Sequence, residues 1–383
     1  MLSELLGSLF GVSLFSYIST RMALAALTAF LFALFSGGPV IRWLQSHSVR
    51  EEAGKSDSLE LAAYAEESGK NKTTTMGGSF LVASLLGSVL LWAQLQNLAV
   101  ILAIVLTAGL AAVGFIDDYK KLTIPGCGGM SRSAKYVGLS VVVLGVLSVL
   151  VWWAQVHGRT TLLTLYPPFF KDVEWNFLAL GWIGIAMFVL FEWFVVVGTS
   201  NAVNIVDGMD GLAAGCTIIT VMALSIFCYV TGRADWTGYL NLPHVADAGE
   251  MAVVGGAMIG ACMGFLWYNA YPAKVFMGDS GSLPLGGLMA WMAVVSKQEL
   301  VLPLAASVFV LDLLSSLVQR YYYRFSGRTK RLFTLAPIHH GLERHGGVFT
   351  KKKEGWHEVT VVVRFWIIAA VGAMASLALL KVR

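Results

Sequence analysis

Apolar residues gather in long, uninterrupted runs along most of the chain. Each run is about as long as the helix of roughly 20 residues that crosses a bilayer. None shows the alternation of apolar and polar residues that marks a barrel strand. We therefore predict an all-α, polytopic integral membrane protein, with about ten transmembrane helices in a single transmembrane domain over residues 1–383. The ten runs lie near residues 22–41, 76–96, 98–116, 136–156, 177–199, 211–231, 250–270, 281–296, 300–322 and 359–380.

The composition agrees with a membrane protein and excludes most soluble classes. Hydrophobic residues make up 57% of the chain and charged residues only 13%, whereas soluble domains carry about 25% charged residues. So few charges cannot cover a water-facing surface, and they exclude disorder and nucleic-acid binding still more firmly. The four cysteines show no metal-binding or redox spacing.

Positive charge indicates on which side of the membrane each loop lies. An even number of spans places both termini on one side, and most of the 27 Lys and Arg residues fall in alternate loops. Because basic loops stay in the cytoplasm, we predict that both termini face outside. The predicted cytoplasmic loops lie near residues 42–75, 117–135, 200–210, 271–280 and 323–358.

Aspartates stand in these loops beside the ends of three apolar runs. Carboxylates crowded at a membrane face repel one another unless a cation joins them, and Mg²⁺ prefers such oxygen ligands. A single aspartate of this kind often caps a helix instead, but capping does not account for so many on one side. The pattern predicts a site for a divalent cation and a phosphate at the cytoplasmic face. Its aspartates are Asp117, Asp118, Asp207, Asp210 and Asp279.

The first motif is a pair of adjacent carboxylates followed by a lysine. Asp117 and Asp118 project about 100° apart on a helix, so one can hold a cation while the other faces a substrate. Lys121 lies three residues beyond Asp118, and its ammonium group can return to the same face.

The second motif combines an amide, two carboxylates and two glycines. Asn204, Asp207 and Asp210 are spaced by three, so one helical face or a tight turn could present all of them. Gly208 and Gly211 allow the backbone to approach a ligand closely. A polar string between two spans is hard to explain as packing.

The third motif begins at Asn269 and ends at the start of a span. Gly278 and Gly281 flank Asp279 there, and the backbone N–H groups of a helix N-terminus favour an anion. Phe276 is an aromatic residue that could stack on a base or anchor at the lipid interface.

Two further strings suggest contacts with a substrate. His339 and His340 stand beside Glu343 in the most basic loop, which indicates substrate or phosphate contact. A zinc site is disfavoured because no further ligand completes the set. The hydroxyl-rich segment from Lys70 to Thr75 precedes a span and suits a pyrophosphate, although it lacks the order of a P-loop.

Together these strings resemble the phospho-N-acetylmuramoyl-pentapeptide transferase family, which belongs to the polyprenyl-phosphate N-acetylhexosamine-1-phosphate transferases. NAVNxxDGxDGLA, VFMGDxGSLxLG and APIHH followed by Glu carry the resemblance, which runs from about Arg21 to the C-terminus. It implies Mg²⁺-dependent transfer of phospho-MurNAc-pentapeptide from UDP to undecaprenyl phosphate, giving lipid I and UMP. This is the first membrane step of peptidoglycan synthesis. The resemblance also implies a homodimer in the bacterial cytoplasmic (inner) membrane.

The resemblance implies a role for each matching residue. Asp279 is the expected Mg²⁺ ligand, Asn204 and Asp207 are expected near the uridine, and Phe276 is expected to stack on the uracil. Asp117 is expected to assist the attacking phosphate in a single step, and a covalent route through an aspartate remains open. The expected catalytic residues are Asp117, Asp118, Asp279 and His339. The expected substrate-binding residues are Lys70, Thr75, Lys121, Lys135, Asn204, Asp207, Asp210, Asn269, Phe276 and His340.

The chain departs from the family pattern at three places. The third histidine of the family's string is Gly341 here. The family's Gly-Thr-Pro-Thr-Met-Gly-Gly loses its first Gly and its Pro before Thr75, and the loops 50–70 and 344–357 look longer than usual. These changes concern loop conformation and inhibitor fit more than the reaction, because no carboxylate is lost.

Three other functions are considered. A sibling transferase would act on UDP-GlcNAc or another UDP-N-acetylhexosamine. A lipid or solute transporter would use the intramembrane Glu192 and Asp312, but the polar groups gather at one face and no internal repeat is visible. A noncatalytic scaffold would release no nucleotide.

Overall fold

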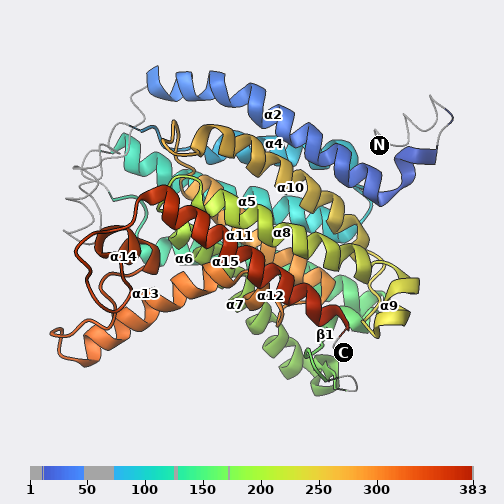
Figure 1. Cartoon of the computed structure of the whole chain (residues 1–383). Coiled ribbons are helices and arrows are strands. Elements are labelled where there is room, and N and C mark those ends of the chain that lie inside the picture. The colour runs from blue at the N-terminus through green and yellow to red at the C-terminus, as the bar shows by residue number, and fades with distance from the viewer. Residues whose placement is uncertain (1–10, 12, 47–72, 125–127, 171–172, 382–383) are drawn as a thin grey trace.

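The computed structural model describes residues 11, 13–46, 73–124, 128–170 and 173–381. Within them, each predicted apolar run contains one long helix (Figure 1), which confirms the all-α class. The run 300–322 is divided into a short and a long helix, and the run 177–199 begins with a separate 3-10 helix. The long helices are α2 (Ile18–Ser46), α4 (Gly78–Trp92), α5 (Leu98–Thr123), α6 (Arg132–Val156), α7 (Gly181–Val206), α8 (Leu212–Thr231), α10 (Ala248–Asn269), α11 (Asp279–Ser296), α13 (Ser307–Phe325) and α15 (Glu358–Ala378).

Short elements connect these helices. Two-residue strands β1 (Thr164–Leu165) and β2 (Trp175–Asn176) form an antiparallel pair. The short helices are η1 (Ser13–Ser16), η4 (Thr160–Leu163), η5 (Phe177–Leu180), α9 (Ala234–Leu240), α12 (Leu302–Ala305), α14 (Ile338–His345) and η6 (Leu379–Lys381).

The helices show that the chain is a multi-pass membrane protein. Seven helical stretches among the described residues are long and apolar enough to cross a bilayer. Three of the long helices, α4, α11 and α13, are not among the seven, so the number of ten spans remains a prediction.

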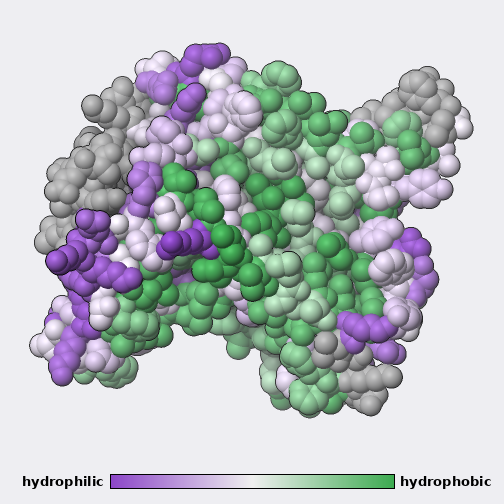
Figure 2. All heavy atoms as spheres, in the orientation of Figure 1, coloured by the Kyte–Doolittle hydropathy of each residue, from purple (hydrophilic) through white to green (hydrophobic). Residues whose placement is uncertain are grey.

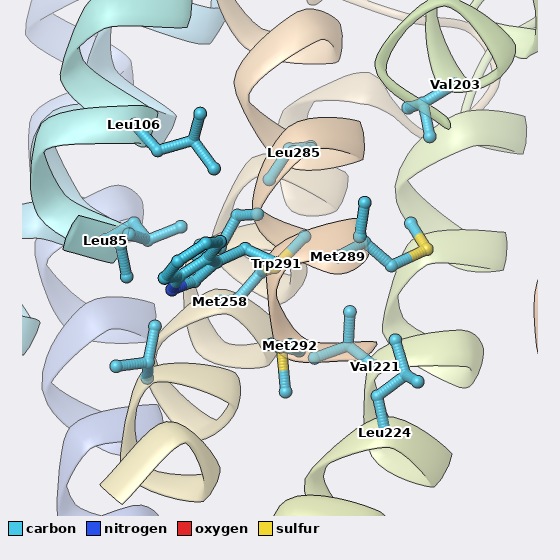
Figure 3. Packing of buried hydrophobic residues seen from close by; sticks show 14 of the residues in the cluster. Leu85, Leu106, Val203, Val221, Leu224, Met258, Leu285, Met289, Trp291 and Met292 are labelled. Carbon is cyan, nitrogen blue, oxygen red and sulfur yellow. The ribbon is translucent and has the colours of Figure 1, made fainter. Parts of the chain in front are cut away.

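Helix α11 forms the centre of the packed helices. Every residue from Asp279 to Ser296 is buried, because α4, α5, α7, α8 and α10 all contact it. Figure 3 shows Trp291, Met289 and Met292 of α11 packed among side chains of the neighbouring helices. The buried indole of Trp291 donates to the carbonyl oxygen of Ala99 on α5 at 3.0 Å, so its one polar atom has a partner.

Small residues let α10 and α2 approach each other closely. Gly256, Gly260 and Gly264 recur at every fourth position of α10 and face the backbone or side chains of α2. A Cβ atom at any of them would collide with α2. This is the packing by which membrane helices associate without a hydrophobic driving force between them.

A buried ion pair joins the same two helices. Both guanidinium NH groups of Arg21 on α2 donate to the carboxylate of Glu250 on α10, at 2.6 and 2.7 Å. The backbone N–H of Gln94 donates to the same carboxylate at 3.1 Å. Arg21 and Glu250 are only 2% and 6% exposed, so each depends on the other for charge compensation.

The buried Glu192 also has a cationic neighbour. The ammonium group of Lys297 lies 2.6 Å from Glu299 and 3.9 Å from Glu192. Burial disfavours the charged form, but Glu299 and Glu192 outweigh it and raise the pKa of Lys297 above its ordinary value. Glu192 therefore lies in a buried group of two carboxylates and one ammonium group, and Lys297 is its cationic neighbour.

The predicted cytoplasmic loops meet at one end of the helices. In Figure 1, α2 begins and α15 ends at the opposite end, as expected for an even number of spans. Figure 2 shows apolar residues over the middle of the visible face and many hydrophilic residues toward the helix ends. Which end faces the cytoplasm remains the prediction of the basic loops.

We expect Arg21→Met to destabilise the protein by about 3–5 kcal/mol, because the substitution leaves the buried Glu250 carboxylate without its counter-charge. Adding Glu250→Gln should recover part of the loss. Thermal unfolding of the detergent-solubilised protein measures both effects. Arg233→Met is the control, since its pair with Asp235 lies at the surface and such pairs contribute little. An unchanged unfolding temperature for Arg21→Met would contradict the assigned role.

Candidate active site

Three aspartates from two helices come together at the end where the predicted cytoplasmic loops meet. Asp117 and Asp118 lie near the C-terminal end of α5, and Asp279 is the first residue of α11. One carboxylate oxygen from each lies within 4.8 Å of the others. The three residues are 3%, 2% and 7% exposed. The structure thus brings two of the predicted motifs into one cluster.

Glycines allow the helices that carry the cluster to touch through their backbones. A Cβ atom on Gly114 of α5 would collide with the backbone of Asp279. A Cβ atom on Gly78 of α4 would collide with the backbone of Gly281. Gly278, just before α11, has a φ of 72°, a conformation that favours glycine. These positions together determine where Asp279 lies.

Asp118 caps helix α11 from the neighbouring helix. Its two carboxylate oxygens accept hydrogen bonds from the backbone N–H groups of Asp279, at 3.2 Å, and Ser280, at 2.9 Å. A carboxylate at a helix N-terminus satisfies unpaired N–H groups and interacts favourably with the helix dipole. Asp118 therefore positions Asp279, whereas its predicted catalytic role has no further support here.

Two ammonium groups and one amide contact Asp279. Lys135 lies 2.6 Å and Lys121 lies 3.0 Å from its Oδ2 atom. The side-chain amide of Asn204 donates to Oδ1 at 2.5 Å and to the hydroxyl of Ser282 at 2.8 Å. These contacts join the ends of α5, α6, α7 and α11 around one carboxylate.

Asp117 shares the lysines with Asp279. Its Oδ2 atom lies 2.8 Å from Lys121 and 3.8 Å from Lys135. Its Oδ1 atom accepts the backbone N–H of Met130 at 2.5 Å. Three carboxylates against two ammonium groups leave one net negative charge, which suits the addition of a cation.

The cluster has the donor set that a hard divalent cation requires. Such ions bind carboxylate and carbonyl oxygens, and Asp117 and Asp279 each present a carboxylate oxygen to the cluster. Both oxygens of Asp118 accept backbone N–H groups of α11, whereas the partners of Asp279 described above are side chains, and we therefore regard Asp118 as the least available ligand. The residues therefore fit a magnesium ion held chiefly by Asp279 with Asp117 beside it.

The loop before α4 runs alongside the loop before α11. Thr74 forms a parallel bridge with Val275, and the backbone N–H of Phe276 donates to the carbonyl oxygen of Thr74 at 2.8 Å. Thr75 is buried with its hydroxyl beside Gly278, and Phe276 is half-buried. Both predicted substrate residues thus stand next to the cluster, whereas Lys70 lies outside the described residues.

Two predicted substrate residues connect loops. Asp210 accepts the backbone N–H of Ala273 at 2.9 Å. Asn269 accepts the backbone N–H of Gly211 at 3.0 Å and donates to the carbonyl oxygen of Val275 at 2.9 Å. These contacts hold the loop after α7 against the loop before α11, so a substrate-binding role for Asp210 and Asn269 remains a prediction.

Glu358 was not expected from the sequence at this site. It lies at the start of α15, and its carboxylate accepts the backbone N–H of Asp210 at 2.9 Å. No motif marks it, and its position at the beginning of the last apolar run is the only signal.

The predicted histidines lie on α14 beside the loop after α7. A Cβ atom on Gly208 would be 2.9 Å from Nε2 of His339 and 3.0 Å from Nε2 of His340. Asp207 immediately precedes this contact and is half-buried. The histidine string thus meets the second motif, about one helical turn beyond Asn204.

Gly341 faces away from this contact. A Cβ atom there would lie 3.0 Å from the hydroxyl of Thr334 and 3.1 Å from the carbonyl oxygen of Leu335. A histidine at this position would therefore point toward the segment before α14. The substitution of the family's third histidine leaves the side facing Gly208 unchanged.

Comparisons with known proteins identify the family of the chain. Residues 100–297 match glycosyl transferase family 4. Over 372 residues, the chain is 40% identical to a phospho-N-acetylmuramoyl-pentapeptide-transferase of Oleidesulfovibrio alaskensis, covering 97% of this chain and 96% of that protein. The chain belongs to the phospho-N-acetylmuramoyl-pentapeptide-transferase family. The resemblance seen in the motifs is confirmed, and the chain is a phospho-sugar transferase. The family 4 match contains the whole carboxylate and lysine cluster of this transferase.

We expect Gly114→Ala to reduce transferase activity about 100-fold, the effect typical of a displacement of about 1 Å in an active site. The added methyl group would press on the backbone of Asp279. Gly145→Ala is the matched control, because a Cβ atom on that α6 glycine meets nothing within 4 Å. Initial rates and thermal unfolding should be measured for both variants. Full activity in folded Gly114→Ala would show that the close approach is not needed.

Proposed function

We propose that this transferase moves phospho-MurNAc-pentapeptide from UDP to undecaprenyl phosphate and produces lipid I and UMP. The reaction would take place at the cytoplasmic face of the bacterial inner membrane, in a homodimer. The observation that carries the chemistry is the Asp279 carboxylate held among Asp117, Lys121, Lys135 and Asn204. The 40% identity to a protein named for this reaction supports the choice of substrates.

The proposed step is a phosphoryl transfer. An oxygen of undecaprenyl phosphate attacks the phosphorus that carries the sugar, and the bond from that phosphorus to the UMP oxygen breaks. The attacking phosphate is already an anion near neutral pH, so positioning contributes more than deprotonation. UMP leaves as an anion, which creates a need for positive charge at the scissile bond.

Lys121 and Lys135 are placed to meet that need. Both lysine side chains are partly exposed while they contact Asp279, and we assign them to contact with a phosphate that enters the cluster. Preorganised cations stabilise charge as it develops and need little reorganisation. We assign these lysines to the pyrophosphate of the sugar nucleotide.

A magnesium ion would be held by Asp279, with Asp117 as the neighbouring carboxylate. When bound, it supplies Lewis-acid neutralisation of the pyrophosphate oxygens. Asp118 keeps Asp279 in place through the N-terminus of α11. Asn204 fixes the other oxygen of Asp279.

Asp117 is assigned to the attacking phosphate. Its hydrogen bond from the backbone of Met130 and its contact with Lys121 hold the carboxylate in a position to orient the nucleophile. A covalent aspartyl intermediate is the other route, and trapping of a labelled phospho-sugar on Asp117 or Asp118 would establish it.

The nucleotide is assigned to the neighbouring loops. Thr75 and Phe276 lie next to Gly278 and the cluster, where the ring of Phe276 could stack on the uracil. Asp207 lies between Asn204 and Gly208 in the chain and is assigned to the uridine side. His340 is assigned to the substrate at the same loop.

The sibling reaction on UDP-GlcNAc remains the second candidate, because the cluster itself does not select the sugar. The identity to a muramoyl-pentapeptide transferase favours the first candidate. Release of UMP should be measured with undecaprenyl phosphate and either UDP-MurNAc-pentapeptide or UDP-GlcNAc. We expect UMP only with both substrates present, only with the muramoyl donor, and only without EDTA. UMP from UDP-GlcNAc alone would establish the sibling reaction, and no UMP from either donor would contradict a transferase of this class.

We expect Asp279→Asn to lower the rate at least 100-fold, on the order of the loss seen when one charge-stabilising group is removed from an active site. The variant should still fold, because Asp118 accepts backbone N–H groups of α11 that the substitution leaves intact. Asp235→Asn, at an exposed pair on the opposite side of the chain's long helices, is the control. Near-normal turnover of Asp279→Asn would refute the assigned metal ligand.

A further inference from the structure

A buried acid–histidine pair lies beside the site, and the proposed step above assigns no role to its acid, Asp312. Asp312 on α13 and His339 on α14 are both 0% exposed. The Nδ1 atom of His339 lies 2.7 Å from Oδ2 of Asp312. A buried carboxylate needs a hydrogen-bond donor. We therefore place the proton of the imidazole on Nδ1, from which it donates a hydrogen bond to Asp312.

The other ring nitrogen of His339 is left for a ligand. Nε2 is buried and has no hydrogen-bond partner among the residues that the structure describes. It faces the backbone of Gly208, where a Cβ atom would be only 2.9 Å away. A buried polar atom without a partner is uncommon, and one in a native site calls for an explanation such as a ligand.

The direction of Nε2 connects the pair to the active site. Gly208 follows helix α7, whose residue Asn204 binds Asp279 about one turn earlier. The side chain of His340 approaches Gly208 as well. The centroids of the His339 and His340 rings are 4.2 Å apart. A substrate group that enters at this loop would therefore meet the Nε2 atom of His339.

We infer that Asp312 is a positioning residue of the transfer reaction, which holds His339 so that the lone pair on Nε2 accepts a hydrogen bond from a hydroxyl group of the phosphorylated substrate at the Gly208 loop. This role rests on the proposed function. Asp312 sets both the tautomer and the ring plane, as carboxylates do for histidines that bind a ligand through the other nitrogen. Asp312 itself touches no substrate.

The expected effect falls on turnover more than on substrate affinity. Nε2 is buried beside Gly208 in the free protein, and we therefore expect its contact with a substrate to form after binding. Interactions made after binding change kcat and leave KM nearly unchanged.

The first test compares variants of Asp312. Asp312→Asn should lower kcat about 10–100-fold, the usual effect of removing the carboxylate that orients a ligand-binding histidine. KM for UDP-MurNAc-pentapeptide should stay close to wild type. Asp312→Glu, which keeps the carboxylate, should recover most of kcat. Ser315→Ala is the matched control, because Ser315 is also buried on α13 and its hydroxyl donates to the backbone carbonyl oxygen of Asp312.

The second test is a double-mutant cycle with His339→Gln. If Asp312 acts through His339, Asp312→Asn should cause no further loss of kcat in the His339→Gln background. A merely structural role predicts that the two losses add. Additive losses in folded variants would overturn the inference.

A third measurement detects the hydrogen bond between Asp312 and His339 without any substrate. The ¹⁵N spectrum of labelled histidines, with His339 assigned from the His339→Gln variant, should show a proton on Nδ1 in the wild type and a changed signal in Asp312→Asn. An unchanged signal would overturn the pairing. Wild-type protein that shows the pairing but releases no UMP would instead overturn the proposed function, and this positioning role with it. The two failures are thus distinguishable.

Discussion

The contact between the N-terminus of α11 and helix α5 is the constraint on which the site depends. Asp118 caps α11 across the interface, and Gly114 lets the two backbones touch. Because Asp279 is the first residue of α11, a displacement of this contact moves the one carboxylate that the lysines and Asn204 share. The rest of α11 is buried on all sides, so its position is set by packing along its whole length.

Three other buried contacts join different elements. Arg21 on α2 pairs with Glu250 on α10, Lys297 at the end of α11 lies 3.9 Å from Glu192 on α7, and His339 on α14 lies 2.7 Å from Asp312 on α13. A charged or polar group without a partner is costly in an apolar environment, so each contact restricts which helices can be neighbours. In the active-site cluster three carboxylates face two ammonium groups, and this excess of negative charge suits a cation, which can in turn bind the anionic phosphates of a substrate.

Much of the fold could be predicted because apolar length alone specifies a spanning helix. The ten runs all became helices, and Asp117 and Asp279 met as their motifs suggested. Contacts between loops could not be predicted. The motifs predicted that Asp210 and Asn269 bind a substrate, and the structure shows that they also bind backbone groups of the neighbouring loop. The sequence offered no explanation for Glu192, which lies beside Lys297 in the structure. Such contacts join residues far apart in the chain, and no local pattern records them.

The sequence by itself determined the class of protein, the positions of the helices, the side on which chemistry gathers and the family, because these depend on composition, run length and short motifs. Only the tertiary structure decided that Asp118 caps a helix while Asp117 contacts the two lysines. Adjacent aspartates are chemically identical until their surroundings differ. It also decided that Gly341 faces away from the site and that Asp312 orients His339, since the direction of a side chain follows from helix packing and not from the order of residues.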